Sequence, residues 1–81
     1  MEARPEGWLL VATNDDVPGV VGRIGTLFGV NGINIAGMQL GREVPGGRAV
    51  SILSLDGPVP DAVLREIRAL PHIRSAALVR L

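Results

Sequence analysis

The chain has 81 residues, of which 47% are hydrophobic, and its eight acidic residues balance its eight basic ones. A chain of this length forms one small domain that buries only about 60–65% of its unfolded surface, so the large apolar share favours self-association. The zero net charge gives no general attraction to nucleic acid or to an anionic membrane. The lack of cysteine excludes disulfides, thiolate chemistry and cysteine-ligated metals, and it fits the cytoplasm.

The two ends of the chain carry no targeting signal that we can identify. Residues 1–6 lack the apolar run and the cleavage site of a signal peptide, and we expect them to form a flexible tail. No stretch approaches the ~20 apolar residues that span a bilayer. We therefore expect one domain over residues 7–81 in a cytoplasmic protein that does not bind membranes.

The first half of the chain predicts a strand, a helix and a second strand. Residues 8–13 are apolar on both alternating faces, as in a central strand with a covered sheet. From Val20 onward the apolar residues follow a helical period until Asn31-Gly32, which is a good helix stop. Residues 33–40 return to a strand pattern.

The second half repeats the same order of strand, helix and strand. Pro45-Gly46-Gly47 predicts a turn, and residues 49–55 predict the third strand. A second helix is expected after Pro60 and ends at Pro71, and residues 73–81 alternate as a last strand. This order predicts an α+β, ferredoxin-like βαββαβ fold, with a four-stranded antiparallel sheet and two helices on one face.

Three glycines, Gly22, Gly25 and Gly29, lie beside the apolar face of the first predicted helix. Each costs up to about 1 kcal/mol of helix propensity relative to alanine. This suggests that another backbone or helix approaches closely there. The alternative is tight packing of the helix on its own sheet.

The junction from the first strand to the first helix carries the functional prediction. A strand that turns through aspartates and Pro-Gly into a helix N-terminus sets carboxylates beside free N–H groups, and this mixture of charges suits an amino acid. We expect Asp16 to hold an ammonium group and the N–H groups of Gly19 and Val20 to face a carboxylate. The amides of Asn14 and Asn34 would orient the ligand. Asn34 would lie near the junction either because both are at nearby ends of the same sheet or because the two meet across a dimer.

Simpler interpretations of these polar residues stay open. Asp15 and Asp16 could be helix-capping residues and nothing more. Asn34 could simply belong to the turn that follows Asn31-Gly32. An aspartate acting as general base would need a companion acid, and none is visible. His72, the only histidine, reads as a surface residue, so we expect no metal, no cofactor and no catalytic triad. With only two aromatic residues in the chain, the sheet also lacks the stacking platform that binds RNA.

The segment Asn14–Val20 (NDDVPGV), followed by Gly32–Ala36 (GINIA), resembles the ACT domain. More narrowly, the chain from Gly7 to Leu81 is similar to the C-terminal regulatory domain of D-3-phosphoglycerate dehydrogenase. The resemblance implies a domain without catalytic residues that dimerises side by side, joins two sheets edge to edge and binds L-serine at the interface as feedback inhibitor. By position, Asp16 would come from one subunit and Asn34 from the other. Family members commonly carry histidine or tyrosine at the position of Asn14.

We therefore expect a small regulatory domain that binds L-serine or a similar amino acid at a homodimer interface and is related to serine biosynthesis. The alternative is a structural dimerisation module without a ligand. Whether the domain stands alone or belongs to a longer dehydrogenase stays open, and the sequence of residues 1–6, which reads as a native start, slightly favours a free-standing protein.

Overall fold

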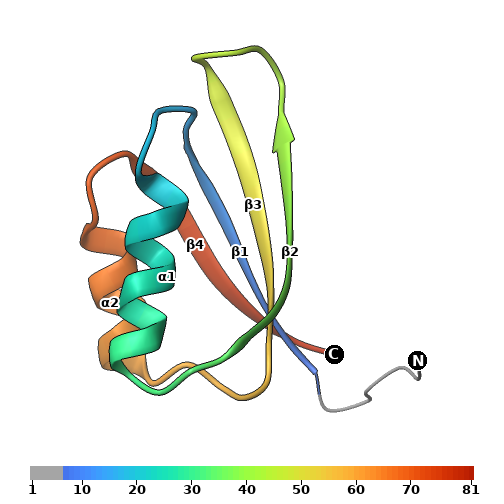
Figure 1. Cartoon of the computed structure of the whole chain (residues 1–81), viewed down its shortest axis with the longest axis vertical. Helices are drawn as coiled ribbons and strands as arrows, with labels where there is room; N and C mark the ends of the chain where they lie inside the picture. The colour runs from blue at the N-terminus through green and yellow to red at the C-terminus, as the bar shows by residue number, and fades with distance from the viewer. Residues whose placement is uncertain (1–6) are drawn as a thin grey trace.

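The structure, a computed structural model, describes residues 7–81, so the tail predicted for residues 1–6 lies outside the described residues. The six predicted elements follow in the predicted order (Figure 1). They are β1 (Trp8–Asp15), α1 (Val20–Val30), β2 (Ile35–Arg42), β3 (Arg48–Leu55), α2 (Asp61–Ala69) and β4 (Ile73–Arg80). Neither helix of the described range is long and apolar enough to cross a membrane.

The four strands form one antiparallel sheet in the order β2-β3-β1-β4, and both helices lie on the same face of it (Figure 1). The predicted ferredoxin-like fold is therefore confirmed. β1 is a central strand, as its apolar residues on both faces predicted, because it pairs with β3 on one side and with β4 on the other. β2 and β4 are the two edges of the sheet.

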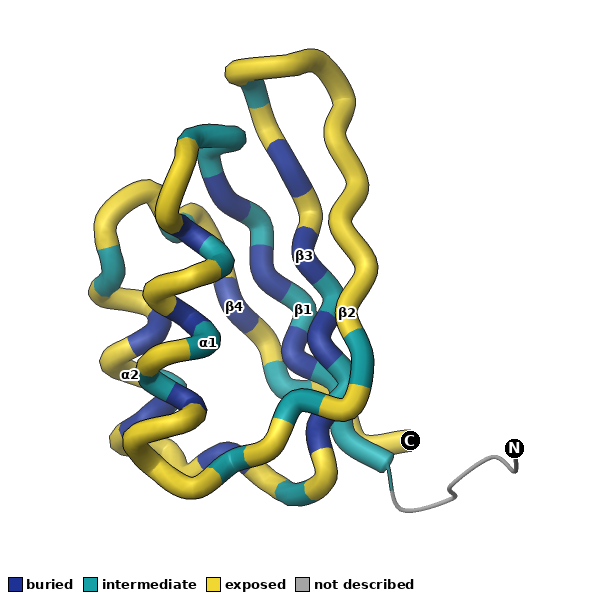
Figure 2. The backbone as a smooth tube through the Cα atoms, viewed as in Figure 1, coloured by how far each residue is buried: buried dark blue, intermediate teal, exposed yellow. Residues whose placement is uncertain are grey.

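The hydrophobic core lies between the helices and the sheet. Alternate residues of each strand point toward the helices, so that the side chains of Leu10 and Leu53 are fully buried there. The helices contribute Ile24, Phe28 and Ile67, which are also fully buried. Figure 2 shows the buried segments concentrated on β1, β3 and the inner faces of the helices, whereas most of β2 is exposed.

Helix α1 is flanked by two glycines whose backbone lies in the left-handed region. Gly19 precedes it with φ 92°, and Gly32 follows it with φ 72°, so the predicted stop at Asn31-Gly32 is confirmed. Within the helix, a Cβ added at Gly22 or Gly29 would meet no atom within 4 Å. Packing against the chain's own sheet therefore does not explain these two glycines, and that interpretation is wrong for them.

Candidate functional site

Asp16 lies in the loop between β1 and α1 and binds the hairpin that joins β2 to β3. Arg42 Nε donates to Asp16 Oδ2 at 2.8 Å, and the Gly46 N–H donates to the same oxygen at 3.0 Å. The Asp16 N–H in turn donates to the carbonyl of Gly47 at 2.8 Å. The Gly46 amide and then the Arg42 guanidinium lower the pKa of Asp16 below its ordinary 3.8, so this carboxylate is charged at neutral pH.

The corner formed by these groups carries both signs of charge at the surface. The Asp16 side chain is 17% exposed and that of Arg42 is 53% exposed. Sequence reasoning missed Arg42 and Gly46 as partners of Asp16. The signal that points to them is the antiparallel order of the strands, because the end of β2 and the end of β1 then lie at the same end of the sheet.

Helix α1 starts shortly after Asp16 in the sequence, with Gly19 as its N-cap residue. No side chain of the described residues caps the helix, and no acidic residue lies in its first turn. The interpretation of Asp15 and Asp16 as helix caps is therefore wrong. The N–H groups that open a helix have no partner within it, so they leave a partial positive charge there. Because the side chain of Val20 is buried, only its backbone, with that of Gly19, can face a ligand.

Asn14 is satisfied inside the protein. Only 3% of it is exposed, and its Oδ1 accepts a hydrogen bond of 3.1 Å from Ser51 Oγ, which is fully buried. Its Nδ2 donates to the carbonyl of Asp15 at 2.9 Å. The buried amide thus stabilises the junction between β1 and α1 from within the protein and does not face solvent.

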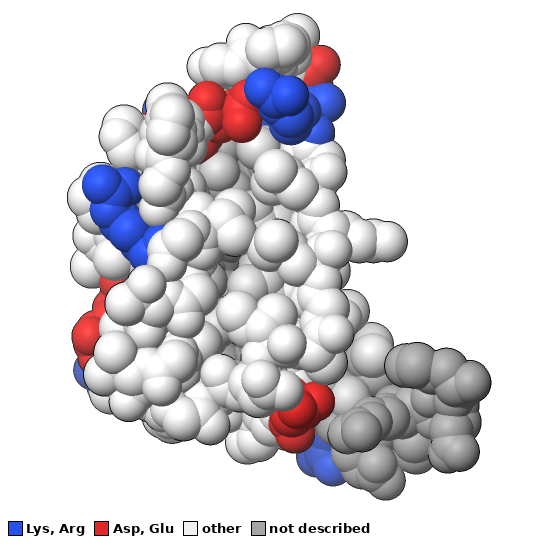
Figure 3. All heavy atoms as spheres, viewed as in Figure 1, with Lys and Arg blue, Asp and Glu red and all other residues white. Residues whose placement is uncertain are grey.

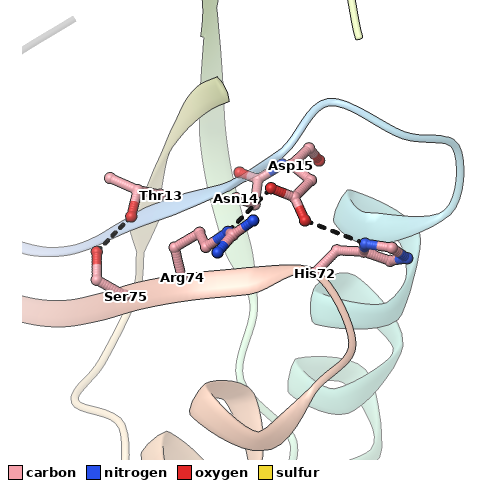
Figure 4. Close-up of polar contacts among 6 residues, drawn as sticks. All are labelled: Thr13, Asn14, Asp15, His72, Arg74 and Ser75. Carbon is pink, nitrogen blue, oxygen red and sulfur yellow. Dashed lines mark hydrogen bonds and ion pairs between the residues drawn. The ribbon is translucent and has the colours of Figure 1, made fainter. Parts of the chain in front are cut away.

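The side chain of Asp15 points toward β4 and the turn that precedes it (Figure 4). Its carboxylate accepts from Arg74 Nε at 3.0 Å and lies 3.2 Å from His72 Nδ1. Arg74 and then His72 lower the pKa of Asp15. The His72 side chain is 46% exposed, which confirms the predicted surface histidine, and its φ of 70° places it in the tight turn before β4.

Asn34 lies at the opposite end of the sheet from this corner. Its Nδ2 donates to Asp56 Oδ2 at 2.7 Å, just beyond the end of β3, whereas Asn14 pairs with Ala49 at the start of β3. The intervening residues of an extended strand span roughly 20 Å. The expectation that Asn34 reaches Asp16 from a nearby end of the same sheet is therefore wrong. Only a second copy of the chain can bring an Asn34 to this corner.

The two edges of the sheet differ in charge. Residues 35–41 of β2 contain no charged side chain, and Met38 and Leu40 are 54% and 50% exposed. The other edge, β4, carries Arg74 and Arg80. In Figure 3 charged side chains lie at the hairpin, on the left side over the helices and at the lower end, while the middle of this view is uncharged.

The fold and these groups define a ferredoxin-like α+β domain whose charged corner adjoins an unpaired, apolar sheet edge. The family model of the ACT domain matches residues 8–72. This chain belongs to the ACT domain family, as its resemblance predicted.

Curated relatives support this assignment. A D-3-phosphoglycerate dehydrogenase of Methanocaldococcus jannaschii is 44% identical over 77 residues, which are 95% of this chain and 15% of the relative. One of Archaeoglobus fulgidus is 46% identical over 79 residues, with the same two shares. The chain thus spans about one seventh of the length of these relatives. The part that it matches is the ACT domain, which is a regulatory domain, and their enzymatic activity lies in the rest of their length.

A solved structure of lower identity shares the fold. The homoserine dehydrogenase of Thiobacillus denitrificans superposes with a TM-score of 0.75 at 21% identity, over 94% of this chain and 17% of that chain. At this identity the similarity shows the fold alone.

Proposed function

We propose that this domain senses an amino acid, L-serine or one of similar size, that two copies of the chain bind jointly. The copies pair through their β2 edges and enclose one ligand at each of two equivalent corners. The domain supplies regulation and no chemistry. Its relatives are D-3-phosphoglycerate dehydrogenases, which supports a role beside such an enzyme, and we assign the domain to serine biosynthesis in the cytoplasm.

The β2 edge supports the pairing. Natural proteins protect exposed edges with charges, short strands or prolines, because a flat edge offers unpaired N–H and C=O groups to another strand. β2 is eight residues long, has no proline, and carries its first charge at its last residue, Arg42. Its exposed Met38 and Leu40 would be covered by a second copy. β4 has arginines at the corresponding edge and is the less suitable partner.

The position of Asn34 carries the proposal. It precedes β2 at one end, and Arg42, the partner of Asp16, closes β2 at the other end. Two copies related by a two-fold axis pair their identical strands in antiparallel fashion. The start of one β2 then lies beside the end of the other, so that Asn34 of each copy comes next to the Asp16 corner of its partner.

The corner has the groups that an amino acid requires. The Asp16 carboxylate suits the ligand ammonium, and both of its hydrogen bonds within the described residues fall on one oxygen, Oδ2. The Arg42 guanidinium and the uncapped N–H groups at Gly19 and Val20 suit the ligand carboxylate. The amide of Asn34 from the partner can both donate and accept.

The mechanism that follows is linkage. A ligand that touches both copies binds the pair more tightly than the separate chains, so it shifts the equilibrium toward the pair and toward one arrangement of it. Any segment attached to the domain would respond to that shift. No group on the domain needs to change chemically.

Calorimetric titration with L-serine, and then with the other common amino acids, tests this function. Asp16→Asn keeps the shape of the side chain but removes its charge, and it should weaken binding about 10- to 100-fold, the range for a lost charged hydrogen bond. Asp61→Asn, at the start of α2, is the matched control and should bind as the unchanged chain does. If no amino acid produced heat or a thermal shift, the domain would be the structural dimerisation module instead.

A further inference from the structure

The face of the sheet opposite the helices is apolar. Because paired residues of an antiparallel sheet point to the same side, the register defines which side chains share this face. The apolar members, which we call the open-face patch, come from the three strands β1, β3 and β4. They are Leu9, Val11, Val50, Ile52, Ala77 and Val79.

No element of the described chain covers this patch. Both helices lie on the other face (Figure 1). Val50 is 36% exposed and Val79 is 41% exposed, and Ala77 is also exposed. An antiparallel sheet that meets water normally alternates apolar and polar side chains, whereas residues 8–12 of β1 are apolar on both sides. A contiguous apolar patch of this kind marks an interaction surface.

The neighbouring part of β2 forms a shallow trough on the same face. Its residues there are Gly37, Gln39 and Gly41, which pair with Ser54, Ile52 and Val50 of β3. Two shallow hollows lie over these positions, between β2 and β3. A Cβ added at Gly41 would meet no atom of residues 7–81 within 4 Å, so no contact in that range requires a glycine there. Glycine in a strand commonly marks a close approach by another backbone or layer.

The area of this face decides which assembly it can hold. Four strands spaced ~4.8 Å apart and eight residues long present a face of roughly 19 by 26 Å, or about 500 Å². Two single chains packed face to face would bury about 1,000 Å² in total, which is less than the 1,200–2,000 Å² of a stable interface. Two edge-paired dimers would bury about 2,000 Å², which is enough.

We infer that the open-face patch is a second interface between copies of this chain, in which two edge-paired dimers stack sheet on sheet into a tetramer. This inference rests on the pairing in the proposed function. The rim of the face carries both signs of charge, with Asp15 opposite Arg48 at the hairpin end and Arg74 beside them. The patch itself carries no charged side chain, so two copies of it can face each other without burying a charge.

Sedimentation equilibrium of the 81-residue chain tests the inference through the assembly mass. The unchanged chain should sediment with the mass of four chains. The double variant Val50→Lys/Val79→Lys places two charges on the patch, at positions that are already exposed, and should reduce the mass to two chains. Val30→Lys is the control, because it introduces a lysine on the outside of α1, where the side chain is 80% exposed. This variant should keep the mass of four chains.

An edge variant separates this inference from the pairing on which it rests. Met38→Lys/Leu40→Lys should give single chains, because faces of single chains bury too little area. The stacking would be overturned, and the edge pairing left in place, by either of two results. One is an unchanged chain with the mass of two chains, and the other is a Val50→Lys/Val79→Lys variant that keeps the mass of four. An unchanged chain with the mass of a single chain would overturn both the stacking and the edge pairing. Circular dichroism checks that each variant is folded, and Ala77→Lys replaces the face variant if it is not.

Discussion

Arg42 Nε lies 2.8 Å from Asp16 Oδ2, and the Gly46 amide reaches the same oxygen at 3.0 Å. A single carboxylate thus joins the loop after β1 to the hairpin after β2. We expect the ligand ammonium of the proposed function to replace Arg42 at Asp16, so that the released guanidinium can bind the ligand carboxylate. The pair would then act as an internal substitute for the ligand while the site is empty.

Replacing Arg42 tests this exchange, because two effects of the change oppose each other. Arg42→Gln removes a competitor for Asp16, but it also removes a partner of the ligand carboxylate. An exposed ion pair contributes little, whereas a charged hydrogen bond to the ligand is worth about 10- to 100-fold in affinity. We therefore expect weaker binding of L-serine by calorimetry, and Arg65→Gln on the outside of α2 should have no effect. Tighter binding by Arg42→Gln would show that Arg42 only competes.

The depressed pKa of Asp16 predicts acid sensitivity of the fold. A group whose pKa is lower in the folded state binds fewer protons there, so its contribution is complete above the ordinary value of 3.8 and is lost as the pH falls through the folded value. Above about pH 4, Asp16→Asn should therefore unfold at a lower temperature than the unchanged chain. This difference should shrink as the pH is lowered further. A difference that stays constant down to the lowest pH would show that the charge of Asp16 does not stabilise the fold.

The buried hydrogen bond between Ser51 and Asn14 predicts a cost for removing one partner alone. Ser51→Ala leaves Asn14 Oδ1 without its donor in the core, which costs about 1–3 kcal/mol of unfolding free energy. Adding Asn14→Ala should cost less than the sum of the two single changes, because neither polar group is then left alone. Urea unfolding of the four chains measures this coupling. Strictly additive costs would mean that the bond contributes nothing to stability.

At two glycines of α1, a substitution is predicted to stabilise the fold rather than to destabilise it. Gly22→Ala and Gly29→Ala add a methyl group in open space within a helix, so each should stabilise the isolated chain by about 0.5–1 kcal/mol. Gly32→Ala is the matched control, because at φ 72° the new side chain is strained and the change should destabilise. Thermal unfolding at low protein concentration measures all three. A loss of stability at Gly22 would mean that the helix end requires glycine for another reason.

The order and type of every element followed from local patterns in the sequence. Apolar residues on both faces of residues 8–13 indicated a central strand, and the helical period from Val20 to the Asn31-Gly32 stop defined α1 to within one residue. These patterns arise within a few residues of one another, so tertiary contacts were not needed to interpret them. β1 and β2 extend two residues beyond their predicted ends, β2 also begins two residues later than predicted, and β4 ends one residue earlier. At these positions only the pairing between strands defines the limit.

The candidate site was harder to predict because its contacts join distant segments. Nothing near Asp16 in the sequence points to Arg42, 26 residues later, as its partner. Asn14 was predicted to orient the ligand through its amide, but its position on β1 buries it against Ser51. The position of Asn34 at the far end of the sheet became clear only from the strand register.

Mixing two inactive variants tests whether the ligand site is shared between copies. Asp16→Ala and Asn34→Ala should each bind L-serine poorly, and a mixed pair of the two retains one corner with both residues intact. If copies pair at random after joint refolding, about one quarter of all corners should regain the affinity of the unchanged chain, as calorimetry would show. A mixture that binds no more than either variant alone would contradict a site built from Asp16 of one copy and Asn34 of the other.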